Sequence, residues 1–419
     1  MTVVFHLAWK SAWNRRFSVL LAMSSIAISM TLLLGVDKIR KEAKNSFLNT
    51  ISQTDLIVGA RSGPINLLLY SVFRIGNATN NVSYQSYQDI INDRKVKWAI
   101  PLSLGDSHRG FRVLGTSQAY FKHYRYADKQ TLQFDKGQAF DDLYDTVVGA
   151  EVAHKLGYQL GDNITLSHGA GKSISAGHDD KPFRISGILE ATGTPVDHTV
   201  HVSLEAIEAI HIDWQAGARS RLQINAEQAR NMGLKPKTVT AFMLGLNKRI
   251  HTFHLQRQIN NYSEEALLAI IPGATLADLW RTLGKFEVVL LAVSTLVLVA
   301  GMLGMLTTLL STLNERRREM AVLRSVGAHS YQILLLLMAE ALLIVFLGCV
   351  TAIFMLYTSM LALKPFLINN YGFNLTITPL DAGQWLLLLL ALLLSLLFSL
   401  IPGFIAYRRS LQDGLTIRT

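Results

Sequence analysis

The sequence contains a single cysteine, Cys349, in 419 residues. One thiol cannot form a disulfide within the chain, so a disulfide-stabilised scaffold is excluded and any folded domain depends on its own core. Charged residues are also scarce, at 17%, against about 25% in typical soluble proteins. Acidic residues are fewer than basic ones: 30 Asp and Glu against 40 Lys and Arg give a formal net charge of +10.

What the sequence has instead is four long apolar runs, in a chain with a mean hydropathy of +0.27. They cover residues 17–36, 288–313, 333–358 and 385–405. A bilayer core of roughly 30 Å takes about 20 helical residues, so each run predicts a transmembrane helix. The first run is longer than a signal-peptide core and no small-residue cleavage site follows it, which predicts a retained anchor.

The short segments beside these runs differ in charge. Three of them are rich in cations: Lys10, Arg15 and Arg16; Arg316, Arg317, Arg318 and Arg324; and Arg408, Arg409 and Arg418. The segment 360–384 has a single basic residue, Lys364. Because cations stay on the cytoplasmic side, this asymmetry predicts that both termini are cytoplasmic and residues 37–287 are outside. Lys38, Arg40, Lys41 and Lys44 oppose this orientation, but long domains translocate largely regardless of charge.

The segment between the first two runs has a mixed α/β pattern. Strands are predicted at residues 55–60, 98–104, 111–116, 183–192, 198–204 and 241–246. Helices are predicted at 205–210, in the first part of 147–166 before a turn at Gly161 and Asp162, and at 264–283 with an interruption at Pro272-Gly273.

The predicted fold is therefore an α-helical membrane protein with four transmembrane helices and a mixed α/β extracytoplasmic domain between helices 1 and 2. Residues 1–36 form the N-terminal segment and first helix, 37–287 the outer domain, and 288–419 the remaining helices with a cytoplasmic loop at 314–330 and a cytoplasmic tail.

An apolar segment follows Ser62-Gly63-Pro64. Pro64 suits the first position of a helix, and that helix would be apolar on most sides. One interpretation is a helix packed in the core or under the domain. The other is an interfacial helix that borders a lateral opening near the membrane.

Residues 169–173, GAGKS, imitate a nucleotide-binding loop. The phosphate-binding motif needs a glycine five residues before Gly171, and that position is Leu166. A nucleotide site is therefore not predicted in this chain, and any energy from ATP must come from a partner.

Ten of the twelve histidines lie in the predicted outer domain. His168, His178, His198 and His201 are candidate zinc ligands, because imidazole and nearby carboxylates such as Asp197 bind zinc well. Their spacing is poor, since residues three apart in a strand, such as His198 and His201, would point to opposite faces. Solvated surface histidines are the alternative. No arrangement typical of a hydrolase stands out, so an enzyme is not predicted.

The loop NERRREMAVLRSVGAHSYQI, residues 314–333, resembles the MacB/FtsX permease family. That family carries a basic-Glu-hydrophobic-Leu-Arg-small-Gly-Ala pattern after its second helix. The matching residues are Arg317, Arg318, Glu319, Leu323, Arg324, Gly327 and Ala328, while Met320 replaces a frequent Ile. Residues 402–415 and 147–166 are also similar to family patterns.

The resemblance implies an inner-membrane ABC transporter permease that works as a homodimer or heterodimer with cytoplasmic ATPase subunits, which hold ATP and Mg²⁺. A periplasmic binding or accessory protein is a further partner, and nucleic acid is not one. The implied ATPase-coupling residues are Arg316, Arg317, Arg318, Glu319, Met320, Leu323, Arg324 and Gly327. The alternative is that the arginines only set topology.

One acid, Glu340, lies inside a membrane run. Such residues are costly and usually face a bundle interior or a partner, so we expect either a structural role or contact with a substrate. A narrower resemblance, carried by residues 55–64 and 198–211, is to a proteobacterial subgroup associated with zinc acquisition.

Three functional classes follow. The first is a transport or mechanotransmission permease powered by a partner ATPase. The second is an FtsX-like regulator that switches an extracytoplasmic partner without moving a substrate. The third is a membrane-anchored receptor without an ATPase, which the loop motif disfavours.

Overall fold

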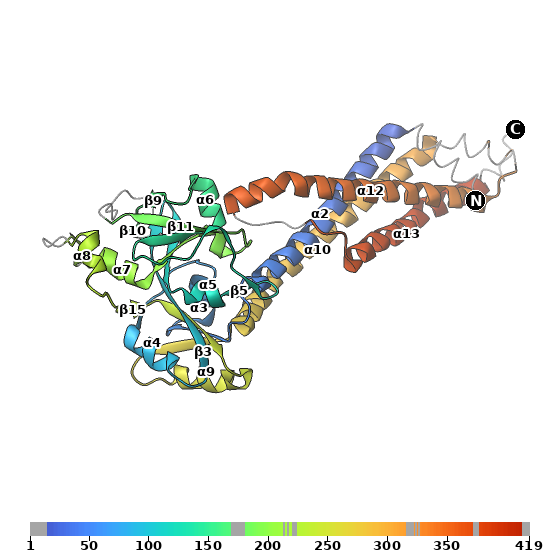
Figure 1. Cartoon of the computed structure of the whole chain (residues 1–419). Coiled ribbons are helices and arrows are strands. Elements are labelled where there is room, and N and C mark those ends of the chain that lie inside the picture. Colours follow the sequence, from blue (N-terminus) through green and yellow to red (C-terminus); the bar gives the residue numbers. More distant parts are fainter. Residues whose placement is uncertain are drawn as a thin grey trace. The chain divides into compact units, whose positions relative to one another are not determined.

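The computed structural model describes residues 15–168, 181–212, 214–215, 218–219, 224–315, 322, 325, 327–371 and 377–412. The chain divides into a helical unit, Met1–Glu42, Gly284–Pro365 and Leu375–Thr419, and an α/β unit, Ala43–Leu283 and Phe366–Asn374. The predicted fold class is confirmed, because the chain has four long apolar helices and a mixed α/β domain, which lies in the sequence between the first and second of them (Figure 1).

The four long helices are α2 (Arg16–Asn49), α10 (Pro272–Glu315), α12 (Ser330–Tyr371) and α13 (Ala382–Gln412). Each is long and apolar enough to cross a membrane. They extend beyond the apolar runs, because helical hydrogen bonds continue through the charged residues that follow. The predicted interruption at Pro272-Gly273 is the boundary between β17 and α10: Pro272 begins α10, where its missing N–H is tolerated.

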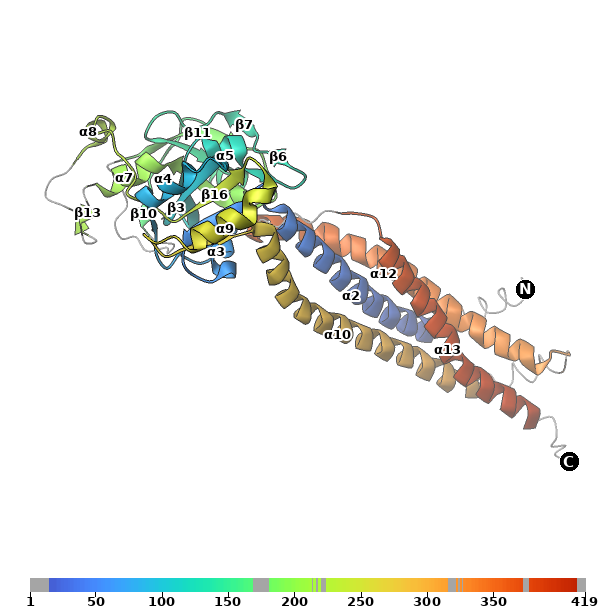
Figure 2. The same ribbon diagram turned by 90° about the horizontal axis from the view of Figure 1, so that it is seen from below.

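Small residues bring these helices together. Figure 2 shows α2 between α10 and α12. A Cβ at Gly301 of α10 would lie 2.8 Å from the Ser29 hydroxyl of α2, which donates to the Val297 carbonyl at 3.2 Å. On the other side, the Thr31 hydroxyl of α2 donates to the Ala352 carbonyl of α12, also at 3.2 Å. Close approach and interhelical hydrogen bonds stabilise helix pairs in a medium where burial of apolar groups brings no gain.

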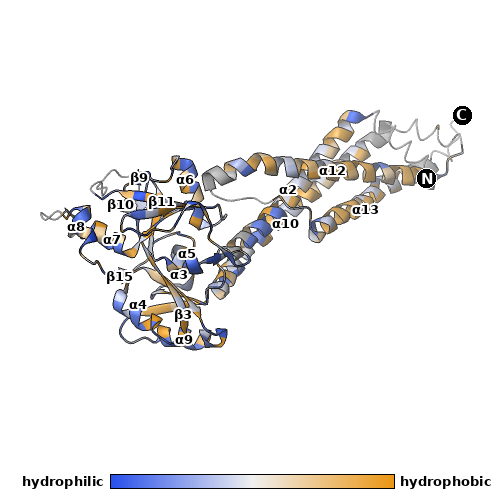
Figure 3. Ribbon diagram, in the orientation of Figure 1, coloured by the Kyte–Doolittle hydropathy of each residue, from blue (hydrophilic) through white to orange (hydrophobic). Residues whose placement is uncertain are grey.

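The outward faces of the helices remain apolar. Figure 3 shows hydrophobic colouring along α12 and α13. On α13 the exposed side chains include Leu386, Leu389, Leu393, Leu397 and Leu400. An exposed apolar surface of this extent is typical of contact with lipid or another subunit.

The α/β unit is built on one large sheet. Its main path is β17-β1-β16-β3-β4-β12-β8-β11-β7, with β10 paired to β3 and β9 to β11. The β4–β12 and β8–β11 pairs are parallel and the others are antiparallel. Its strands are β1 Leu56–Ala60, β3 Val96–His108, β4 Phe111–Thr116, β7 Phe134–Gly137, β8 Asp145–Val148, β9 Asn163–Ile164, β10 Ser167–His168, β11 Phe183–Leu189, β12 Thr199–Ser203, β16 Ala241–Leu246 and β17 Leu267–Ile270.

Short helices pack around the sheet. They are α3 Pro64–Ser71, α4 Tyr84–Ile91, α5 Ala119–His123, α6 Ala150–Leu156, α7 Leu204–His211, α8 Ala226–Arg230 and α9 Thr252–Asn260, with 3₁₀ turns at Pro195–His198 and Arg249–His251. Three small two-stranded pairs complete the unit: β2 Val82–Ser83 with β15 Thr238–Val239, β5 Arg125–Tyr126 with β6 Gln130–Thr131, and β13 Trp214–Gln215 with β14 Ala218–Arg219.

The six strands predicted from the sequence are confirmed as β1, β3, β4, β11, β12 and β16. Two helix predictions were wrong. The helix proposed at the start of 147–166 begins only at Ala150, because Val147 and Val148 belong to strand β8. The helix proposed from residue 264 is strand β17 over Leu267–Ile270, which pairs with β1. In both cases pairing with a distant strand outweighs local helical pattern.

Helix α3 is the apolar segment that begins at Pro64. Leu67, Leu68 and Tyr70 are fully buried in the main core cluster of the α/β unit. The first interpretation of this segment, a helix packed in the core, is therefore confirmed.

Candidate functional site

Most of the predicted coupling residues, Arg316, Arg317, Arg318, Glu319, Met320, Leu323 and Arg324, lie outside the described residues. The eighth, Gly327, has a φ of +97° just before α12 begins at Ser330. Only glycine adopts such a backbone readily, so the glycine of the motif is required by the turn that leads into α12.

Glu340 lies in α12 and is only 2% exposed. Its side chain is therefore directed into the helical unit and not toward lipid, as expected for an intramembrane carboxylate.

A polar group that we call the Asp37 cluster joins α2 to the start of α13. The Asp37 carboxylate accepts from Lys41 Nζ at 2.7 Å, from Arg40 at 2.9 Å and from the Gln384 amide at 3.2 Å. Lys41 also bonds Asp381, at 2.7 Å. Asp381 in turn accepts from the Gln384 backbone N–H at 2.8 Å, which caps α13.

Lys38 completes the Asp37 cluster although it is almost fully buried. Its ammonium donates to the Thr378 carbonyl and, at 3.2 Å, to the Pro379 carbonyl. Three of the four cations that oppose the predicted orientation, Lys38, Arg40 and Lys41, thus have partners within the helical unit. Sequence reasoning missed these contacts because residues near 38 and near 380 are far apart in the chain. The Asp-x-x-Gln pattern of a helix cap at Asp381 was the one local signal.

The helix ends are also anchored within the α/β unit, in a group that we call the joint. Phe47 near the end of α2 contacts Phe73 at 4.7 Å and Trp280 of α10 at 6.2 Å between ring centroids. The Tyr124 hydroxyl donates to the Thr50 carbonyl at 2.8 Å. Beyond the joint, α2 and α10 lead into β1 and β17, which are paired neighbours in the sheet.

The candidate zinc ligands are not brought together among the described residues. His201 is fully buried in β12, with its ring centroid 5.2 Å from that of Tyr120 and its Nδ1 3.2 Å from the Val147 carbonyl oxygen. His198 ends a 3₁₀ turn and does not share a strand with His201, so the predicted strand geometry was wrong. The side chains of His168 and His178 lie outside the described residues. In the described part of the chain no group of three or more His, Cys, Asp or Glu side chains could hold a metal ion.

Burial lowers the pKa of His201 to about 3, and the nearby Arg74 guanidinium adds to this effect. The folded state therefore binds fewer protons than the unfolded state, whose histidine has a pKa of about 6.5. Stability falls as pH drops below about 6.5, and at pH 5 the loss from this residue is about 2 kcal/mol relative to pH 7. Burial lowers the pKa of His108 and His198 in the same direction, so some acid sensitivity remains without His201.

Between pH 7 and pH 5 the free energy of opening β12 should fall by about 2 kcal/mol less in His201→Phe than in the wild type. The reason is that phenylalanine cannot be protonated. Amide hydrogen exchange of β12 in the full-length protein measures this free energy. The exposed His254, replaced in the same way, serves as the control. An unchanged pH dependence in His201→Phe would contradict the prediction.

Comparison with known proteins identifies the family. A family model described as the MacB-like periplasmic core domain matches residues 19–241, more than half of the chain. A second, the FtsX-like permease C-terminal model, matches residues 291–414. A search of curated proteins found no matching sequence.

Two solved structures are similar to this chain at low identity. The periplasmic region of MacB from Actinobacillus actinomycetemcomitans has 9% identity and a TM-score of 0.33, covering 55% of this chain and 94% of that one. The extracellular domain of the noncanonic ABC-type transporter YknZ from Gram-positive bacteria has 11% identity and a TM-score of 0.31, covering 52% and 99%.

The two family models together cover most of the α/β unit and most of the helices α10 to α13. Four apolar helices and this family indicate a multi-pass inner-membrane protein with a periplasmic domain. The family supplies membrane components of ABC transporters and works with cytoplasmic ATPases. The chain therefore belongs to the MacB/FtsX-type family of ABC transporter permeases.

Proposed function

We propose that this permease subunit couples ATP hydrolysis in a partner ATPase to movement of its periplasmic domain, for transport or mechanotransmission. One observation carries the proposal. Helix α10 runs unbroken from Pro272, directly after strand β17, to Glu315 at the start of the predicted coupling loop. At 1.5 Å per residue its 44 residues extend about 66 Å, roughly twice the bilayer core.

A continuous helix transmits displacement because its backbone hydrogen bonds resist stretching and bending. At its far end the displacement would act on the joint, where Phe47 and Trp280 pack together. It would then reach β17 and β1, whose registered pairs include Ile57 with Ile270. Ile57 and Ile270 are both core residues, so movement of the helix ends must move the sheet or strain its packing.

The ATPase would dock on the loop 314–330, with Met320, Leu323 and Val326 in its groove and the arginines at the rim. Hydrolysis then takes place in the separate ATPase subunit, which holds ATP and Mg²⁺, and this chain has no catalytic role. A second permease copy would complete the complex, and the exposed leucines of α13 are one surface available for it.

This mechanism needs the termini and the loop 314–330 in the cytoplasm. The arginine asymmetry supports that orientation, and the Asp37 cluster is compatible with it, since Lys38 and Lys41 have partners there. In a Cys349→Ser background, we expect an impermeant maleimide on intact cells to label exposed Arg94→Cys and to spare Arg317→Cys. Labelling of Arg317→Cys alone would reverse the orientation.

The alternative is an FtsX-like regulator that uses the same movement to switch an extracytoplasmic partner and moves no substrate. Both functions share the ATP-driven step. They differ in what stimulates ATP turnover in the reconstituted complex: a soluble periplasmic protein alone for the regulator, a transported substrate for the transporter.

The ATP-driven step is tested by hydrogen exchange of the full permease bound to its partner ATPase. We expect a non-hydrolysable ATP analogue to change exchange in the joint and in β17, peptides 43–60 and 267–283. The exposed helix α8, outside the proposed route, should not change. Identical hydrogen exchange in the joint with and without nucleotide would contradict the proposal.

A further inference from the structure

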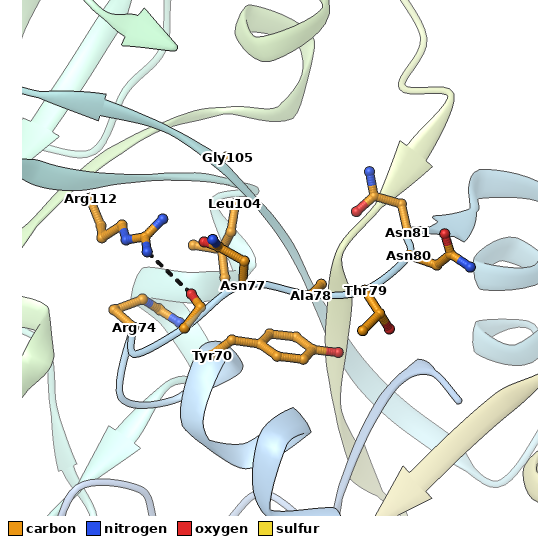
Figure 4. A pocket seen from close by; sticks show the side chains of 11 residues that line it. Tyr70, Arg74, Asn77, Ala78, Thr79, Asn80, Asn81, Leu104, Gly105 and Arg112 are labelled. Atoms are coloured by element: carbon orange, nitrogen blue, oxygen red, sulfur yellow. Dashed lines mark hydrogen bonds between the residues drawn. The ribbon is translucent and has the colours of Figure 1, made fainter. Parts of the chain in front are cut away.

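The α/β unit contains a polar cavity that the proposed function does not use. Its volume is about 420 Å³, within the range of roughly 300–1,000 Å³ typical of small-molecule sites. The loop 74–81, which follows α3, forms one wall, and β3 and β4 contribute Leu104 and Arg112. Figure 4 shows the two arginines, Arg74 and Arg112, on one side of the cavity and Asn80 and Asn81 on the other.

The lining is cationic and rich in hydrogen-bonding groups. It includes the amides of Asn77, Asn80 and Asn81 and the Thr79 hydroxyl, and it contains no acidic residue. Arg112 donates to the Gly76 carbonyl at 3.2 Å, which holds the loop in place. Among the described residues neither guanidinium is within ion-pair distance of a carboxylate. The cavity thus carries two positive charges with no paired negative charge in the described structure.

Arg74 is held in an unfavourable state. Its φ is +60°, a left-handed conformation that is unfavourable for a non-glycine residue. One guanidinium nitrogen donates to the Ser71 carbonyl, but Nε is buried without a hydrogen-bond partner. Arg74 is only partly buried, but a cation with a buried, unsatisfied donor is stabilised when a negative group comes to it.

The core residues near Arg74 do little to neutralise its positive charge. Burial raises the pKa of Tyr120, against the opposing effect of the Arg74 guanidinium, so Tyr120 stays neutral. His201 is neutral as well. The buried Asp197 carboxylate accepts from the backbone N–H groups of Thr192 and Gly193, at 2.7–3.0 Å, and from the Thr192 hydroxyl at 2.7 Å. Its oxygens are therefore occupied by that loop.

We propose that this cavity binds a small hydrophilic anion bearing a carboxylate or phosphate group. Arg112 and Arg74 would hold the charged group, because guanidinium groups match both anions with paired N–H donors. Asn77, Thr79 and Asn81 would hydrogen-bond the polar remainder of the molecule. The inference goes beyond the proposed function and stands without it, since binding needs neither ATP nor the partner ATPase.

The test uses the full-length protein in detergent at constant ionic strength, with pyrophosphate and citrate as probes of the two anion classes. We expect at least one probe to protect segments 74–81 and 104–112 saturably from hydrogen exchange. Arg112→Gln should weaken that binding at least tenfold. Arg94→Gln removes an exposed guanidinium elsewhere on the domain and should bind as the wild type does.

A second variant keeps the test informative if Arg112→Gln disturbs β4. Asn77→Asp places a negative charge in the cavity from an exposed loop residue and should also weaken anion binding at least tenfold. Protection by only one probe assigns the anion class. If neither probe gives saturable protection, or if Arg112→Gln and Asn77→Asp both bind as the wild type does, the site does not exist as proposed.

Discussion

Leu323→Asp should abolish co-purification of the partner ATPase and the ATP turnover of the complex. If residues 314–330 form a helical coupling segment, as the sequence predicts, Leu323 would share its apolar side with Met320 and Val326, outside the predicted membrane runs. In a docked complex the aspartate would be desolvated without a partner, at a cost of several kcal/mol. Because about 1.4 kcal/mol corresponds to a tenfold change in affinity, we expect ATPase binding to weaken at least 100-fold.

Val322→Asp is the matched control. Val322 is adjacent in sequence and 62% exposed, so the same charge there stays solvated and should leave most ATPase binding intact. Both variants should insert normally, since the changes lie outside the membrane helices, and gel filtration of the detergent-solubilised protein checks this. Full ATPase binding and full turnover in Leu323→Asp would show that the arginines of the loop act only on topology.

A flexible Gly-Ser-Gly-Ser insertion between Leu283 and Gly284 should uncouple the periplasmic domain from the ATPase. The insertion divides α10 at the boundary between the two units. Glycine costs a helix about 1 kcal/mol per residue, so the insertion breaks the helix there. We expect the ATPase still to bind and hydrolyse ATP, while the nucleotide-dependent exchange change in residues 267–283 falls by more than half.

The same four residues inserted after Gly233 provide the control. Gly233 lies in an exposed loop of the α/β unit with a φ of +55°, and a Cβ there would meet no atom within 4 Å. That insertion should leave the exchange change as it is in the wild type. If the α10 insertion also leaves it unchanged, force does not travel along α10, and α2 alone would have to carry it.

The membrane part of this protein could be predicted from the sequence because its signals are local. Runs such as residues 288–313 need no partner to be recognised, since length and apolarity alone decide whether a helix can cross a bilayer. Strands β1, β4 and β16 were recognisable for a similar reason, being short apolar runs between breakers. The family motif 314–333 also lies in one continuous stretch.

Only the tertiary structure revealed the features that depend on contacts between distant segments. Lys41 looked like an unexplained cation until the fold placed it against Asp381, and His201 looked like a surface residue or zinc ligand until β12 placed it in the aromatic core. Strand β17 looked helical until β1 paired with it. Arg74 and Arg112 are far apart in sequence and share a cavity only because α3 packs against the sheet that contains β4. Sequence by itself determined which segments enter the membrane and which family the chain resembles, because those depend on consecutive residues. Burial, pairing and the cavity depend on contacts between distant segments, which local pattern does not encode.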